Sequence, residues 1–280
     1  MCMGLGCNAV GVTGCRIIDS KRERLIAMLT NALVPCNGRF PTLIALISLF
    51  FVTSVGIWSS AVSALSLAAM LLLSVLATLL CSKLLSVTVL RGAPSSFTLE
   101  LPPYRVPEVG KVIVRSVLDR TLFVLGRAVA VAAPAGLVLW LLANCSVGGE
   151  SLLFWGASFL DPFGRLLGMD GVILLAFVLA IPANEIVLPV ILMAYTSGGA
   201  LVEYGSLSEL RLLLTANGWT AVTALCVGVF MLFHFPCSTT LLTIKKESGK
   251  WRWAFLAAVL PTLLGAVLCV LIASVARMVA

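Results

Sequence analysis

The sequence is short of charge, and this shortage is its most restrictive feature. Only 11% of the 280 residues are Asp, Glu, Lys or Arg, whereas 60% are hydrophobic. A chain of this length cannot hide so much apolar surface inside a water-soluble core. The composition therefore predicts an integral membrane protein, with membrane lipid as its surroundings.

The signatures of soluble enzymes are missing as well. The sequence has no G-x-x-x-x-G-K-[ST] phosphate-binding loop, no C-x-x-C pair and a single histidine, His234. We therefore expect no nucleotide site and no enzymatic activity in this chain. The N-terminus lacks a basic stretch followed by an apolar core, so no cleavable leader is expected and insertion relies on internal helices. The net charge of +7 is modest and lies in loops, which favours membrane orientation over nucleic-acid binding.

The apolar runs predict an all-α integral membrane fold, a polytopic helical bundle with about five full spans plus re-entrant gate segments. Ser20 and Glu23 have the spacing of a capping box and predict the start of a helix that ends near Pro35. The predicted spans are residues 41–57 and 61–82, which form a hairpin, and residues 121–142, 219–244 and 254–276. The polar, proline-rich stretch 83–120 carries an excess of basic residues and is expected to lie in the cytoplasm. The stretch 144–171 contains several aromatic residues, which suggest that it lies along the outer interface of the membrane.

Residues 172–195 are long enough to cross the membrane, but their centre is interrupted by Pro182, Asn184 and Glu185. If this segment were a simple span, the basic stretch 245–252 would lie outside, against the positive-inside rule. If the segment instead turns near Pro182 and returns to the outer face, the basic stretch lies inside. Charge therefore favours a re-entrant hairpin.

Three cysteines stand at predicted breaks in the helices. Cys7 lies in a glycine-rich stretch over residues 1–16, while Cys36 and Cys237 each follow a proline. Glycine weakens a helix, and proline removes a backbone donor and frees an upstream carbonyl. A soft thiol beside unwound carbonyls is a plausible ligand for a transition-metal cation. The remaining cysteines in or at the ends of apolar runs are interpreted as packing residues: Cys81, Cys145, Cys226 and Cys269.

A second group of polar or sulfur-containing residues lies inside apolar segments. Glu185 is costly to bury in a membrane, which favours a functional role over a neutralised structural pair. His234 and Cys237 have i, i+3 spacing and could share a helix face, unless the break at Pro236 separates them. Accessory ligands could come from the amide or thioether groups of Asn8, Asn184, Met193 and Met231, although a methionine here is more often a packing residue.

Several motifs, in order along nearly the whole chain, resemble the membrane part of the ferrous iron transport protein B (FeoB) family of bacteria and archaea. The segments that carry this resemblance are Gly6-Cys7-Asn8 through Arg16, Arg22-Glu23-Arg24-Leu25, Cys36-Asn37-Gly38-Arg39-Phe40-Pro41, Leu101-Pro102-Pro103-Tyr104-Arg105-Val106-Pro107, Asn184-Glu185, and Pro236-Cys237 through Trp253. Val10 departs from the pattern, since the family has a proline in its first gate motif. The family also carries a cytoplasmic GTPase domain and further helices before this region.

The resemblance implies a ferrous iron permease unit in a multi-pass bacterial or archaeal cell membrane, with Fe(II) as the transported ion. Its expected metal pathway comprises Cys7, Cys36, Cys237 and Glu185. The expected partners are a GTPase or N-terminal half of the same system and, in a homo-oligomer, further copies of the chain. The implied regions are a first gate region with a transmembrane hairpin (1–90), a cytoplasmic linker (91–120) and a second gate region with the C-terminal spans (121–280). A carrier for nucleosides or other organic solutes and a truncated, non-transporting subunit remain as alternatives.

Overall fold

The computed structural model describes residues 2–52, 58–92, 108–115, 122–147, 149–196 and 206–279. The first half contains α1 (Cys2–Gly6), α2 (Asn8–Gly14), η1 (Cys15–Ile17), α3 (Lys21–Thr30), η2 (Asn31–Leu33), η3 (Asn37–Arg39), α4 (Phe40–Ile47), η4 (Ser48–Val52) and α5 (Ser59–Val87). The second half contains α6 (Val109–Arg115), α7 (Phe123–Asn144), α8 (Leu152–Leu166), α9 (Gly171–Leu179), η7 (Asn184–Ile186), α10 (Val187–Tyr195), α11 (Leu207–Ala216), α12 (Ala221–Phe233), α13 (Ser238–Ser248) and α14 (Trp251–Val279). The two-residue strands β1 (Ser146–Val147) and β2 (Glu150–Ser151) pair in an antiparallel ladder. The predicted all-α fold is confirmed.

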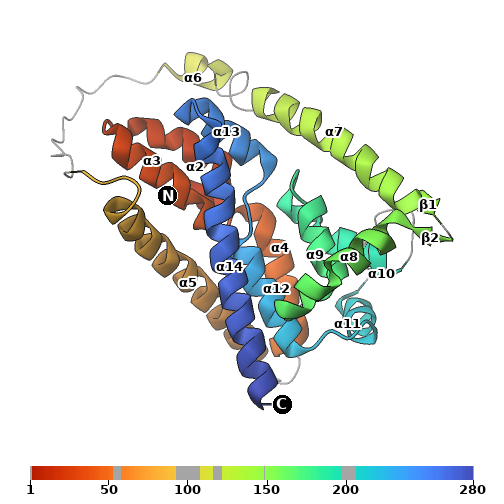
Figure 1. The fold of residues 1–280 in the computed structure, drawn as a ribbon. Coiled ribbons are helices and arrows are strands. Elements are labelled where there is room, and N and C mark those ends of the chain that lie inside the picture. The colour runs from red at the N-terminus through yellow and green to blue at the C-terminus, as the bar shows by residue number, and fades with distance from the viewer. Residues whose placement is uncertain are drawn as a thin grey trace.

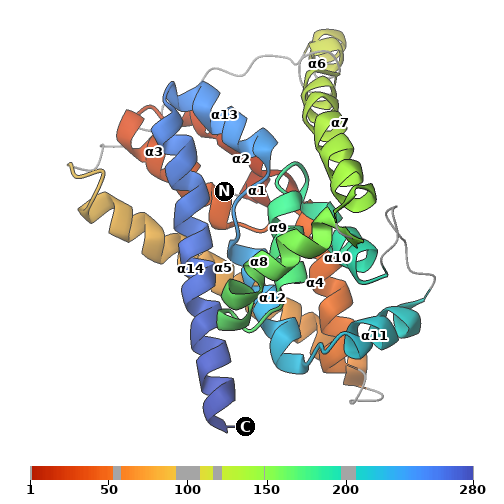
Figure 2. The ribbon, with the colours of Figure 1, turned by 45° about the vertical axis from the view of Figure 1, so that its right-hand side comes forward.

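Among the described residues, four helical stretches are long and apolar enough to cross a membrane: Lys21–Val52, Ser59–Val87, Ala221–Ser248 and Trp251–Val279. A bent pair, α8 and α9, adds a fifth if it is one span, with 109° between the two helices. In both views α14 runs almost the length of the molecule, and it packs against α12 (Figures 1 and 2). The fold is therefore that of a multi-pass membrane protein. The described residues provide four or five candidate spans, and the sequence predicted about five.

The long outer helices present apolar side chains to their surroundings. Leu72 and Leu79 on α5 are 69% and 62% exposed, and Phe255 on α14 is 72% exposed. In a membrane protein such apolar surfaces contact lipid. A helix can lie there because it satisfies its backbone hydrogen bonds internally. By contrast, the part of α12 from Val227 to Phe233 is buried, with at most 5% of any of its hydrophobic side chains exposed. The core therefore lies around α12.

Residues 172–195 form the predicted hairpin. α9 descends to a break at residues 180–183, and α10 returns alongside it. The two open ends meet, because the Tyr195 hydroxyl at the end of α10 donates to Asp170, the N-cap of α9. Trp219 Nε1 also donates to the Tyr195 hydroxyl over 2.9 Å. The chain therefore turns back at this break as predicted, and the open ends of the hairpin are anchored just before α12.

Other expectations needed adjustment or lie outside the described residues. The glycine-rich N-terminus is not unwound but forms α1 and α2, separated only at Cys7. The predicted start of the helix is confirmed, since Ser20 is the N-cap of α3 and its Oγ accepts the Glu23 N–H over 3.4 Å. Most of the expected linker falls outside the described part of the chain. Cys226 and Cys269 are buried as expected for packing residues, but Cys145 is exposed and its interpretation as a packing residue was wrong.

Candidate functional site

The three cysteines at the predicted breaks occupy equivalent positions. Cys7 precedes α2, Cys36 precedes η3 and Cys237 precedes α13, and each is the N-cap of its helix with no side-chain capping bond. All three are half-buried, whereas Cys15, Cys226 and Cys269 are fully enclosed. The sequence therefore places each thiol where a helix starts again, close to backbone N–H groups that lack intrahelical partners.

Asn184 joins two of these breaks. Its carboxamide is buried, with Oδ1 3.2 Å from His234 Nε2 and with Nδ2 3.9 Å from the Cys36 sulfur. Asn184 begins η7 at the tip of the α9–α10 hairpin. A second bond ties the same tip to the break after α12, because the Ser238 N–H donates to Ile181 O over 2.8 Å. The hairpin tip thus contacts both cysteine-bearing breaks.

Arg39 provides the other link. This side chain is completely buried, and Nη1 donates to Leu232 O over 2.6 Å. Nη2 donates to His234 O and Phe235 O over 3.0 and 3.3 Å. The guanidinium therefore connects η3, directly after Cys36, to the unwound segment that leads to Cys237.

We call the three interruptions at residues 34–37, 180–186 and 234–237 the break junction. α2, which begins directly after Cys7, packs against α13, which begins directly after Cys237. Within the described residues, however, no group of three or more His, Cys, Asp or Glu side chains forms a ready metal site. The thiols are gathered in one region of the fold without being assembled into one coordination sphere.

The break at Cys7 is braced by Asn31. A Cβ on Gly4 would lie 2.5 Å from Asn31 Oδ1, and a Cβ on Gly11 would lie 2.6 Å from the same oxygen. Asn31 Nδ2 donates to Asn8 O over 2.9 Å. Only glycine allows the carboxamide to sit this close to both α1 and α2. The glycine-rich sequence therefore serves close packing around a polar side chain.

The remaining expected site residues fall into two environments. Glu185 is exposed beside Gly38, at the edge of the break junction, and no ion pair in the described residues involves it. His234, Met193 and Met231 are buried instead, with His234 completely enclosed. The His234 ring uses both nitrogens, because Nδ1 lies 3.0 Å from Met231 O while Nε2 faces Asn184.

The proposed i, i+3 face of His234 and Cys237 does not exist in this fold. α12 ends at Phe233, and His234 has extended backbone angles of φ −71° and ψ 170°. Pro236 then separates the histidine from the start of α13, so the two side chains belong to different helices. The Cys237 sulfur instead lies 3.2 Å from Thr240 Oγ1.

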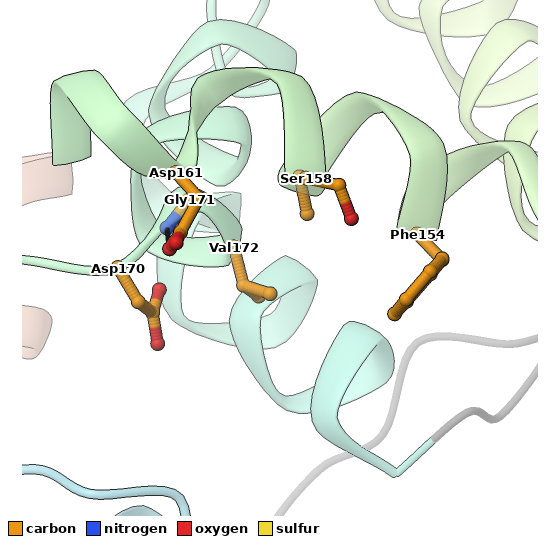
Figure 3. A pocket seen from close by; sticks show the side chains of 7 residues that line it. Phe154, Ser158, Asp161, Asp170, Gly171 and Val172 are labelled. Atoms are coloured by element: carbon orange, nitrogen blue, oxygen red, sulfur yellow. Dashed lines mark hydrogen bonds between the residues drawn. The ribbon is translucent and has the colours of Figure 1, made fainter. Parts of the chain in front are cut away.

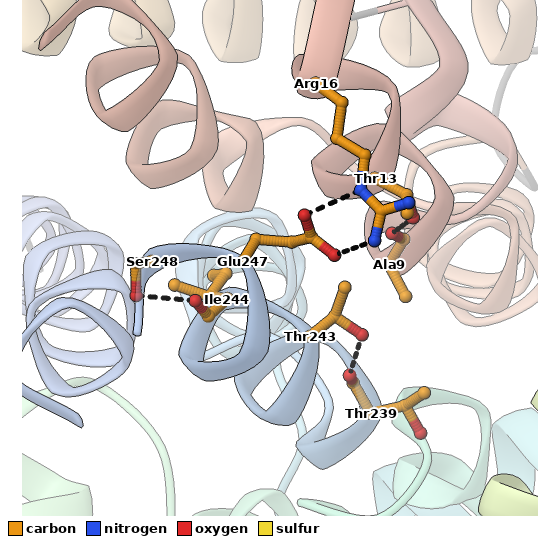
Figure 4. Close-up of polar contacts among 8 residues, drawn as sticks. All are labelled: Ala9, Thr13, Arg16, Thr239, Thr243, Ile244, Glu247 and Ser248. Carbon is orange, nitrogen blue, oxygen red and sulfur yellow. Dashed lines mark hydrogen bonds and ion pairs between the residues drawn. The ribbon is translucent and has the colours of Figure 1, made fainter. Parts of the chain in front are cut away.

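An ion pair joins η1, directly after α2, to α13 at the end of the molecule that bears the basic loop. Arg16 Nε and Nη2 lie 2.7 and 2.5 Å from the two carboxylate oxygens of Glu247 (Figure 4). These hydrogen bonds raise the pKa of the Arg16 guanidinium above its usual value, so the arginine stays charged. The nearby hydroxyls of Thr13 and Thr243 bond backward to carbonyls within their own helices. The contact thus couples the break at Cys7 to the helix that follows Cys237.

A pocket of about 270 Å³ lies where α8 crosses α9 and is lined by Phe154, Ser158, Asp161 and Asp170 among others (Figure 3). Its two carboxylates are engaged in the fold. Asp161 Oδ1 accepts the Gly171 N–H over 3.2 Å, and its Oδ2 pairs with Arg165 Nε at 2.6 Å. Asp170 caps α9 through the Ile173 N–H over 2.7 Å. The acidic groups therefore brace the helix crossing.

Sequence reasoning did not identify Arg39 and Asn31 as site residues. Arg39 carries a signal that could have found it, because a single arginine sits between the break at Cys36 and an apolar run. Asn31 carries a weaker one, since an amide near the end of a helix is common. The hydrogen-bond partners of Arg39 and Asn31 are backbone carbonyls at distant positions in the sequence, and no local sequence pattern reveals such partners.

Helices that are interrupted in mid-course, with the interruptions meeting inside the bundle, define a class of membrane protein that includes many transporters. By sequence, the chain is similar to the C-terminal part of FeoB proteins. A family model described as "Ferrous iron transport protein B C terminus" matches residues 67–119, and one described as "Gate: Nucleoside recognition" matches residues 125–251.

Curated relatives agree with these matches. The chain is 27% identical to the Fe(2+) transporter FeoB of Staphylococcus aureus (strain MSSA476), over 93% of this chain and 38% of the relative. It is 26% identical to the FeoB of Methanocaldococcus jannaschii, over 99% of this chain and 41% of the relative. A Porphyromonas gingivalis relative, also 26% identical, is a fusion of Fe(2+) transport protein A with FeoB, and the match covers 90% of this chain and 34% of that protein. No solved structure matches the chain.

The chain thus spans about 40% of the length of these relatives and matches only their C-terminal part. Together with the long apolar helices, the matches identify a multi-pass cell membrane protein related to iron transporters.

Proposed function

We propose that this chain forms the membrane pathway for Fe(II) in an FeoB-like transport system and is not itself an enzyme. The observation that carries the proposal is the set of three half-buried thiols, each at the restart of a broken helix. Thiolates are soft ligands that suit late first-row divalent metals, and unwound backbone supplies further oxygen ligands. The names of the curated relatives support iron as the substrate.

In this proposal Cys7, Cys36 and Cys237 bind the ion in succession. The thiols do not form one closed three-ligand group, which favours a relay over a resident metal site. A relay suits transport, because an ion held too tightly by a complete coordination sphere would leave slowly. Glu185, exposed at the edge of the break junction, provides a carboxylate at which the hydrated ion first exchanges water for protein ligands.

The other expected ligands take supporting roles. Asn184 positions Cys36 and His234, while Asn8 contributes a backbone carbonyl to the Asn31 brace. His234, Met193 and Met231 are enclosed in the core, and we assign them to packing and hydrogen bonding. The first gate region (1–90), the linker (91–120) and the second gate region (121–280) are then parts of one unit, which the contact of α2 with α13 supports. The partners in this proposal are the GTPase-bearing remainder of the system, further copies of the chain and membrane lipid.

A carrier for nucleosides is the second candidate, because one matching family model is described as nucleoside recognition. Such a carrier would need free amide groups to bind a base. Both ends of the buried Asn184 amide instead have partners within the protein, and the Nδ2 group of Asn31 donates to Asn8 O. A non-transporting subunit is the third candidate, and it predicts no metal binding by this chain alone.

The test is anaerobic Fe(II) binding to the purified chain in detergent. Wild type is compared with Cys7→Ser, Cys36→Ser and Cys237→Ser, and with Cys145→Ser as the matched control, since Cys145 is exposed and outside the junction. Binding that is weakened in each of the variants Cys7→Ser, Cys36→Ser and Cys237→Ser and unchanged in the control is the expected result. Binding that survives in all three would refute the thiol pathway. Uptake that needs Glu185 but none of the cysteines would favour the organic-solute carrier.

A further inference from the structure

Arg39 is a buried charge with an unusual set of partners. The side chain is completely enclosed, and among the described residues its hydrogen bonds go to three backbone carbonyls, those of Leu232, His234 and Phe235. No carboxylate in the described part of the chain forms an ion pair with it. A buried guanidinium without an acidic partner is expensive, so its retention calls for a specific role.

The three carbonyls are available because α12 stops. The helix ends at Phe233, the next residue is extended, and Pro236 has no N–H to offer. Carbonyls at the end of a helix lack intrahelical partners and carry the negative end of the helix dipole. In broken-helix transporters, unwound carbonyls and half-helix C-termini of this kind coordinate a monovalent cation such as Na⁺. At this break, the cationic position is occupied by a side chain.

We propose that Arg39 is a tethered cation that fills a carbonyl site otherwise suited to Na⁺ or K⁺, and that it thereby positions Cys237 relative to Cys36. Arg39 lies three residues after Cys36, and its last carbonyl partner, Phe235, lies two residues before Cys237. The guanidinium therefore spans the two cysteine-bearing breaks. Its role as a positioning residue rests on the proposed function, whereas its role as a cation substitute does not.

The proposal predicts that removing the side chain creates a cation site. Arg39→Ala leaves three inward-facing carbonyls around a cavity, and these oxygens are hard ligands of the kind that alkali cations prefer. The variant is expected to melt roughly 10 °C below wild type in choline chloride. Na⁺, K⁺ or millimolar methylguanidinium is expected to restore at least half of this loss, with no comparable effect on wild type.

The experiment compares melting temperatures of the full chain in detergent for wild type, Arg39→Ala, Arg39→Lys and Arg39→Met, in choline chloride, NaCl, KCl and methylguanidinium chloride. Arg211→Ala is the control, because Arg211 is an exposed arginine on α11. Arg39→Lys retains a tethered cation and is expected to need no added ion. Arg39→Met has similar bulk without charge and is expected to behave like Arg39→Ala.

A second readout tests positioning. Oxidative cross-linking of Cys36 to Cys237, followed by mass spectrometry of the peptides, is expected to fall at least threefold in Arg39→Ala and to recover with methylguanidinium. Equal stability of the Met and Lys variants, or an Arg39→Ala protein that responds to no cation, would overturn the proposal. Failure of the Lys variant to fold would also count against it, because a tethered charge would then not suffice. These measurements use no iron, so their failure is separate from a failure of the Fe(II) proposal.

Discussion

Asn184 Oδ1 lies 3.2 Å from His234 Nε2, although 50 residues separate the two along the chain. Both side chains are buried, and the bond joins the tip of the α9–α10 hairpin to the end of α12. The contact determines how the only histidine is used. It directs the imidazole toward the hairpin, while the Cys237 sulfur contacts Thr240 Oγ1.

Replacing either member of this pair should destabilise the fold. His234→Leu leaves the Asn184 carbonyl without this partner, and Asn184→Leu leaves His234 Nε2 without its partner, so each is expected to cost about 1–3 kcal/mol. The double variant should cost less than the sum of the single variants, because the pair is lost only once. Thermal unfolding in detergent measures the cycle, and strictly additive losses would contradict the coupling.

The crossing of α8 and α9 should tolerate no side chain at Gly171. A Cβ there would lie 2.0 Å from Ala157 O, a distance that neither backbone can accommodate without moving. Gly171→Ala is therefore expected to lower the melting temperature strongly or to abolish folded expression. Gly136→Ala is the matched control, since its Cβ meets nothing within 4 Å, and alanine there should stabilise α7 by up to about 1 kcal/mol. Equal behaviour of the two variants would show that the crossing is not close-packed.

The Tyr195 hydroxyl should be needed to close the hairpin. Tyr195→Phe removes the donor to Asp170 and the acceptor for Trp219, which is expected to cost about 1–3 kcal/mol. Trp219→Phe removes only the second of these bonds and should cost less through hydrogen bonding. Hydrogen exchange of α9 and α10 amides in detergent is the measurement. Faster exchange confined to this hairpin in Tyr195→Phe is expected, and unchanged exchange would rule out the anchor.

The ion pair of Arg16 with Glu247 should contribute little to stability and more to coupling between α2 and α13. Because the Arg16 side chain is 59% exposed, Arg16→Glu is expected to cost only about 0.2–1 kcal/mol, and less in high salt. Combining Arg16→Glu with Glu247→Arg should recover the loss. The melting temperatures of both single variants and the double variant at low and high salt check this. A double variant as unstable as the sum of the singles would mean that the pair does not act as an ion pair.

The sequence anticipated the hairpin through the interruption near Pro182 and the distribution of basic residues. Placing the basic stretch 245–252 on the inner side required residues 172–195 to return, and the Asp170–Tyr195 bond bears out that return. It also anticipated the break at each cysteine, because proline and glycine act locally on the backbone. It failed at Cys145 and left the relation of His234 to Cys237 open, because exposure and direction depend on neighbours that are distant in sequence.

By itself, the sequence determined that this is a helical membrane protein with interruptions at Cys7, Cys36 and Cys237, since hydrophobicity, proline and glycine impose these features without reference to the rest of the fold. Only the tertiary structure decided which interruptions meet. Arg39 reaches carbonyls 193 to 196 residues away, and Ser238 reaches Ile181 across a third segment. Such contacts form because buried polar groups need partners, and the packing of whole helices determines which partners lie within reach.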